Sequence, residues 1–111
     1  MTTFTREDFE HAARSIGWRL VAFDGVTPVV QVHDGARAFG WRPHADDGDA
    51  LRLAVALRLQ VTPGTYNSEE VTAYRSGHAE SHERVHFQQD IGAATRHAIF
   101  RAAIAIGRAM P

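Results

Sequence analysis

The chain has 111 residues, a formal net charge of −1 and no cysteine. That length allows one domain around one hydrophobic core, and the lack of cysteine excludes disulfides and thiolate metal sites. Proteins that bind nucleic acid through its phosphates usually carry a basic excess, so the charge argues against a nucleic-acid partner. We therefore expect a single domain over residues 1–111.

No part of the sequence predicts a membrane segment. The first residues lack a basic region leading into an apolar run, so we expect no signal peptide. The apolar runs are much shorter than the ~20 residues that span a bilayer. We expect a cytoplasmic protein without a membrane partner.

The first third of the chain predicts a helix and a hairpin. Thr5 is a good N-cap for a helix over 6–16, Asp8 completes a capping box, and Gly17 is a typical end. Strands at 19–23 and 29–32 flank an Asp24–Gly25 turn, which is typical of a hairpin. Residues 36–45 are predicted to form a connection.

The second helix, capped by Asp46 or Asp47, is apolar nearly all round. Its large residues occupy two sides of a helical wheel: Leu51, Val55 and Leu59 on one, Leu53, Ala56 and Leu57 on the other. Such a helix is usually buried on both sides. If the sheet covers one side alone, the other must meet another helix or another chain.

The rest of the chain predicts short strands and a long final helix. Strands are expected at 60–62, 70–75 and 84–88, and a helix from about 91 to 108 whose main apolar stripe is Ile99, Ala102, Ala103, Ile106 and Met110. The order of elements predicts an α+β fold. We expect an antiparallel or mixed sheet of four to five strands packed with three helices, in a layered α/β/α-type sandwich.

A histidine-rich segment is the clearest candidate for chemistry. His82-Glu83-Arg84-Val85-His86 matches the H-E-x-x-H pattern of zinc peptidases, in which two histidines on one helix face bind zinc and the glutamate is the general base. Here the alternation around Val85 favours a strand instead. The pattern leaves a zinc-dependent hydrolase as an alternative.

His78, His82 and His86 are spaced by four residues and so share one face of either a helix or a strand. They are the candidate metal ligands, although a solvated polar face is the simpler interpretation. No catalytic residue and no cofactor is predicted.

The remaining charged clusters have structural interpretations. Asp46, Asp47 and Asp49 lack the spacing of a calcium loop and are adequately explained by helix capping. Five arginines on the second and third helices offer a face for phosphate: Arg52, Arg58, Arg96, Arg101 and Arg108. A solvated helix face explains them more simply, and a nucleic-acid-binding accessory protein remains a further alternative.

Two stretches resemble a known family. Over roughly 40–60, the pattern consists of Trp41, Pro43, Asp46 and Asp49-Ala50 with Val55 and Leu57; over roughly 90–108 it is Ala98-Ile99-Phe100-Arg101-Ala102-Ala103. These pieces resemble the phage alpha-beta-alpha sandwich domain family of small phage and prophage proteins. The resemblance implies the sandwich fold and a bacterial host cell, and it supplies no catalytic residues.

The two helices with broad apolar surfaces indicate the leading function. They carry more apolar surface than one buried face requires, which is typical of chains that meet another protein. We therefore expect a small phage-type accessory protein without enzymatic activity, acting as a protein-binding or self-associating module. Its expected partner is a second copy of the chain, in a homo-oligomer, or another protein.

Overall fold

The computed structural model describes residues 4–24, 29–62, 70–75, 78–86 and 90–111, with 78–86 described by their backbone alone. Its elements, in chain order, are α1 (Arg6–Ser15), β1 (Arg19–Asp24), β2 (Val29–His33), β3 (Ala38–Gly40), α2 (Asp47–Leu57), β4 (Gln60–Thr62), β5 (Glu70–Arg75), β6 (His78–His86) and α3 (Ile91–Ala109). No helix in these ranges is both long and apolar enough to cross a membrane.

Helix α1 begins as its sequence predicts. The Thr5 side chain accepts a hydrogen bond from the Asp8 backbone N–H at 3.2 Å, and the Asp8 carboxylate accepts one from the Thr5 N–H at 2.9 Å. This reciprocal pair satisfies two N–H groups that the first helical turn leaves without partners. The helix ends one residue earlier than expected, and it buries Phe9 and its neighbouring alanines.

The strands form two separate sheets. Both are antiparallel and three-stranded, in the orders β1-β2-β3 and β4-β5-β6. The α+β class is confirmed, whereas the single sheet of four to five strands is wrong. Short turns in the sequence predict that consecutive strands pair, but they carry no information about whether two groups of strands meet edge to edge. Strand β3, expected as part of a connection, extends the first hairpin by pairing with β2.

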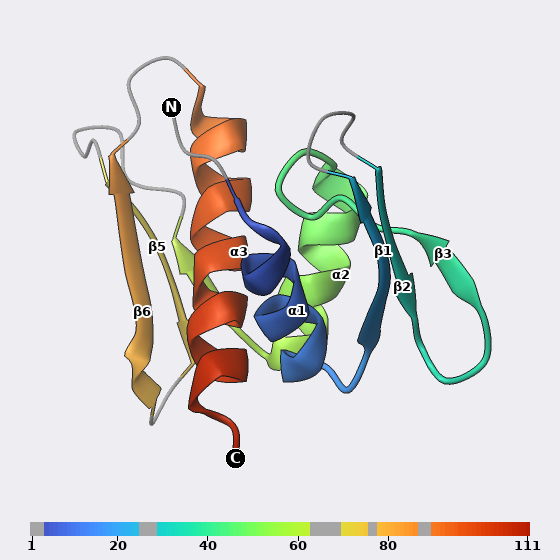
Figure 1. Ribbon diagram of the computed structural model, residues 1–111. Helices are drawn as coiled ribbons and strands as arrows, with labels where there is room; N and C mark the ends of the chain where they lie inside the picture. Colours follow the sequence, from blue (N-terminus) through green and yellow to red (C-terminus); the bar gives the residue numbers. More distant parts are fainter. Residues whose placement is uncertain (1–3, 25–28, 63–69, 76–77, 87–89) are drawn as a thin grey trace.

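The layer order is also the reverse of the one expected. The helices lie between the two sheets, with α3 packed against β5 and β6 on one side and against α1 and α2 on the other (Figure 1). The described part of the chain is thus arranged β/α/β, not α/β/α. A helix that is apolar on several sides can form the middle layer, and this accounts for most of the broad apolar surface of α3.

The core is centred on aromatic rings from distant parts of the chain. Trp41 and Phe100 are its largest fully buried side chains, and Phe9 packs against Phe100 with ring centroids 4.8 Å apart. Phe4 meets the same Phe100 ring edge-on at 4.7 Å. Met110, expected on the buried stripe of α3, is 39% exposed because the helix ends at Ala109.

Helices α1 and α3 approach each other closely at Gly107. A Cβ added to this glycine would overlap the backbone carbonyl of His11 on α1. No other side chain is small enough for that position without moving one helix. Gly107 therefore sets the separation of the two helices.

Candidate functional site

Two aspartates organise the start of α2. The Asp46 carboxylate accepts a hydrogen bond from the Asp49 N–H at 2.8 Å, and Asp49 in turn accepts one from the Arg42 N–H at 2.9 Å. Asp49 also pairs with the Arg52 guanidinium at 2.6 Å. The predicted capping role is confirmed for Asp46, and these contacts connect the helix to the turn that precedes it.

The side of α2 that carries Leu51 and Val55 is open. Ala50, Leu53 and Leu57 are buried on the other side, whereas Leu51 is 64% exposed and Val55 is 63% exposed. The expectation that α2 is buried on both sides is therefore wrong, because no described element covers these two side chains. The sequence pattern indicates an apolar surface, but it does not indicate whether another element of the same chain packs against that surface.

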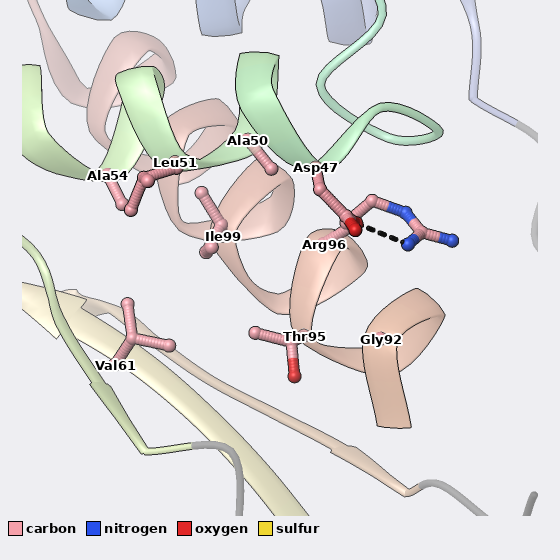
Figure 2. Close-up of a pocket in the computed structure, with 9 residues that line it drawn as sticks. All are labelled: Asp47, Ala50, Leu51, Ala54, Val61, Gly92, Thr95, Arg96 and Ile99. Atoms are coloured by element: carbon pink, nitrogen blue, oxygen red, sulfur yellow. Dashed lines mark hydrogen bonds and ion pairs between the residues drawn. The ribbon is translucent and has the colours of Figure 1, made fainter. Parts of the chain in front are cut away.

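An apolar groove lies beside this open side of α2. It has a volume of about 390 Å³ and runs between α2, α3 and β4. We call it the groove; its lining residues are Asp47, Ala50, Leu51, Ala54, Val61, Gly92, Thr95, Arg96 and Ile99. Figure 2 shows Ile99 of α3 at its back and Val61 of β4 across from α2. Leu51 belongs to both the open side and the groove.

One ion pair marks the polar end of the groove. The Arg96 Nη1 atom lies 2.7 Å from the Asp47 Oδ1 atom and so links α3 to α2 (Figure 2). The Arg96 side chain is 21% exposed and that of Asp47 is 85% exposed. Arg96, expected on a solvated face, is instead largely covered, and its buried Nε–H has no hydrogen-bond partner among the described residues. Asp47 keeps room for a second cation.

Strand β4 borders the groove, and one of its edges, which we call its free edge, has no partner among the described strands. It is the first strand in the order β4-β5-β6, and β5 is the one described strand that pairs with it. No described strand pairs with the other edge of Gln60–Thr62, and such an edge presents backbone N–H and C=O groups. Free sheet edges and apolar grooves are both features by which proteins bind segments of other proteins.

The predicted metal candidates lie on strand β6. The segment pairs antiparallel with β5, with Val71 opposite Val85 and Ala73 opposite Glu83, and its register shifts between Ala73 and Arg75. The preference for a strand is confirmed, and the helix that H-E-x-x-H zinc chemistry needs is not formed. The side chains of His78, His82 and His86 lie outside the described set, so their metal binding stays a prediction.

Elsewhere, the described side chains offer no alternative metal site. No three His, Cys, Asp or Glu residues among them lie close enough together to hold an ion. Asp46 and Asp49 are engaged in the capping contacts described above, and Asp47 pairs with Arg96.

The predicted arginine face is partly neutralised. Arg52 pairs with Asp49, Arg96 pairs with Asp47, and the Arg108 Nη2 atom lies 3.9 Å from the Asp8 Oδ1 atom. Each pairing reduces the positive potential that a phosphate backbone would meet. A nucleic-acid partner stays a prediction with less support than the sequence pattern alone suggested.

Two histidines with shifted pKa values lie in the aromatic cluster, and no sequence motif indicates them. Phe4 packs edge-on against His44 and His97, with centroid distances of 6.0 and 5.3 Å. Burial lowers the pKa of both imidazoles, and Arg42 beside His44 and Arg101 beside His97 lower it further. A single histidine has no sequence pattern that would reveal such surroundings.

Comparisons with family models, curated proteins and solved structures found no match for this chain. The resemblance to the phage sandwich family therefore stays a prediction, and the β/α/β layer order differs from the α/β/α order that it implies. The open side of α2 and the groove are the features of the described structure that bear on function.

Proposed function

We propose that this protein is a non-enzymatic protein-binding module whose docking surface is the open side of α2 together with the groove. The observation that carries the proposal is the exposure of Leu51 and Val55 beside an apolar groove. Fully burying a Leu or Val side chain is worth roughly 1.5–3 kcal/mol, so leaving two exposed on one helix forgoes stability that a partner can recover.

The groove and the free edge of β4 suit a protein segment. An apolar side chain fits among Ile99, Ala54 and Val61, while the backbone of Gln60–Thr62 can pair with an extended chain. Arg96 and Asp47 at one end add polar contacts that orient the segment. A docking site usually combines an apolar centre with a polar rim in this way.

A peptide-selection experiment tests the docking surface and does not require an identified partner. Immobilised protein is used to select binders from a random peptide library, and the enriched peptides are re-tested against single variants. We expect apolar peptides that lose at least about tenfold in affinity for Leu51→Asp, because a buried carboxylate without a partner opposes docking.

The matched control is Val29→Asp. Val29 is 48% exposed on β2, in the other sheet, so the same charge change there leaves the docking surface intact. Peptides that bind Val29→Asp and Leu51→Asp equally well would show that the docking surface lies elsewhere.

A further inference from the structure

The outer side of α2 carries three residues in one line, and a fourth follows at its C-terminal end. Asp47, Leu51 and Val55 follow each other at four-residue spacing, and Arg58 comes three residues later at the C-cap. Since residues four apart are neighbours on a helix surface, Asp47, Leu51 and Val55 form a continuous row. Arg58 follows this row at the end of the helix, where its backbone is left-handed (φ 57°, ψ 41°), and we call the four residues the α2 stripe. All four are exposed, and Asp47 also pairs with Arg96.

The α2 stripe is complementary to itself when reversed. It reads acidic, apolar, apolar, basic, so two copies packed antiparallel place Leu51 against Val55 of the other chain. The same arrangement brings Asp47, at the start of one helix, to the end of the other helix, where the exposed Arg58 side chain lies. A twofold axis at the level of Leu53 makes both ends equivalent, which is the geometry of an isologous dimer.

We infer that the partner of the docking surface is a second copy of this chain, bound through antiparallel α2 stripes. The inference rests on the proposed docking surface and names its occupant. The Asp47 carboxylate has two oxygens, of which Oδ1 contacts Arg96, so Arg58 of the other copy can approach Oδ2. In a parallel packing, like charges would face each other at both ends.

The size of the contact indicates a weak dimer. A stable interface buries about 1,200–2,000 Å² in total, and helix α2 has 11 residues, or about three turns, to contribute. We therefore expect a dimer whose population rises with protein concentration over a measurable range. Sedimentation velocity over a concentration series measures this directly.

A charge-exchange experiment tests the antiparallel arrangement. Arg58→Glu places like charges at both ends of the dimer, as does Asp47→Arg, and each variant alone is expected to dimerise about tenfold more weakly than the unmodified protein. In an equal mixture, Asp47 of the first variant faces Arg58 of the second, and at the other end the introduced glutamate faces the introduced arginine. The mixture is expected to recover wild-type dimerisation.

Two further measurements keep the result interpretable. Thermal unfolding of each variant shows whether it is folded, since Asp47→Arg also removes the contact with Arg96. Because the chain has no cysteine, Leu51→Cys and Val55→Cys can be joined by a short bismaleimide. Cross-linking is expected to be faster in the mixture of the two than in either variant alone.

The outcomes separate this inference from the proposed function. A monomer at every concentration, or a mixture that dimerises no better than its components, would overturn the antiparallel dimer. If peptides then still bind Leu51→Asp more weakly than Val29→Asp, the proposed docking surface is supported and its partner is a different protein. The opposite result is that the peptides bind Leu51→Asp and Val29→Asp equally well while the mixture of Arg58→Glu and Asp47→Arg recovers wild-type dimerisation. That result would support the dimer and contradict the docking of other protein segments.

Discussion

Gly107 is the residue whose role is most sharply defined by the structure. Gly107→Ala should lower the free energy of unfolding by about 1–3 kcal/mol, because the methyl group meets the His11 carbonyl and forces α1 away from α3. Urea denaturation measures the loss.

Gly92→Ala is its control, since Gly92 lies on the same helix and its added Cβ would meet flexible side-chain atoms of Arg96 and Asp90 at 3.4 Å. That substitution should be neutral or stabilise the protein by up to about 1 kcal/mol. Equal effects of the two substitutions would contradict the close helix approach.

His44 and His97 should make stability depend on pH. Their pKa values are lowered from 6.5 in the folded state, so below that pH the unfolded chain binds more protons than the folded one. The free energy of unfolding should therefore fall as the pH decreases from about 7.5 to about 5.5. Urea denaturation at several pH values in this range measures the dependence.

The double variant His44→Gln, His97→Gln separates this effect from other titrations. Its stability is expected to be lower overall because the aromatic contacts with Phe4 are lost, but its pH dependence should be shallower. An unchanged slope would assign the pH dependence to other groups.

At the scale of single elements, the cap of α1 offers the simplest test. Thr5→Ala removes the side-chain acceptor of the Asp8 N–H and should reduce stability by about 1 kcal/mol. Thr5→Ser keeps a hydroxyl and should change stability little. A loss of the same size for both variants would show that the methyl group of Thr5, not its hydroxyl, matters.

Elements were predictable where local chemistry determines them. The capping residues Thr5 and Asp46, the β-branched run at Val29 and the long apolar helix α3 all appear close to their expected bounds. Strand β3 was not predictable because three residues carry too weak a pattern, and its pairing with β2 depends on the hairpin beside it. Met110 was expected in the core because periodicity does not determine where a helix ends, and α3 ends one residue before it.

At the scale of the whole molecule, the arrangement was not predictable from the pattern of elements. The breadth of apolar surface on α2 and α3 is evident in the sequence, but it has two different causes. Helix α3 is covered because it lies between other elements, whereas α2 leaves Leu51 and Val55 uncovered. A helical wheel describes both helices alike, since only the packing of distant segments decides which surface another element reaches.

The candidate site depends on the same long-range packing. Arg96 and Asp47 are 49 residues apart, and no sequence spacing indicates that they meet. Likewise, no described strand pairs with the free edge of β4 because the described strands form two sheets. The α2 stripe, by contrast, consists of residues of α2 and its C-cap, which are close in the sequence, so it could be recognised there once its exposure was known.

The central position of α3 also governs how the chain is made. Helices α1 and α2 and strands β5 and β6 all pack against α3, yet α3 begins at Ile91 and follows every one of them (Figure 1). Translation adds about 5–20 residues per second, so for several seconds the earlier helices and strands exist without α3, the helix against which they pack. A chain that ends before Ile91 lacks the helix against which these elements pack, so its apolar side chains stay exposed to chaperones and proteases. We expect the domain to fold only after α3 has left the ribosome.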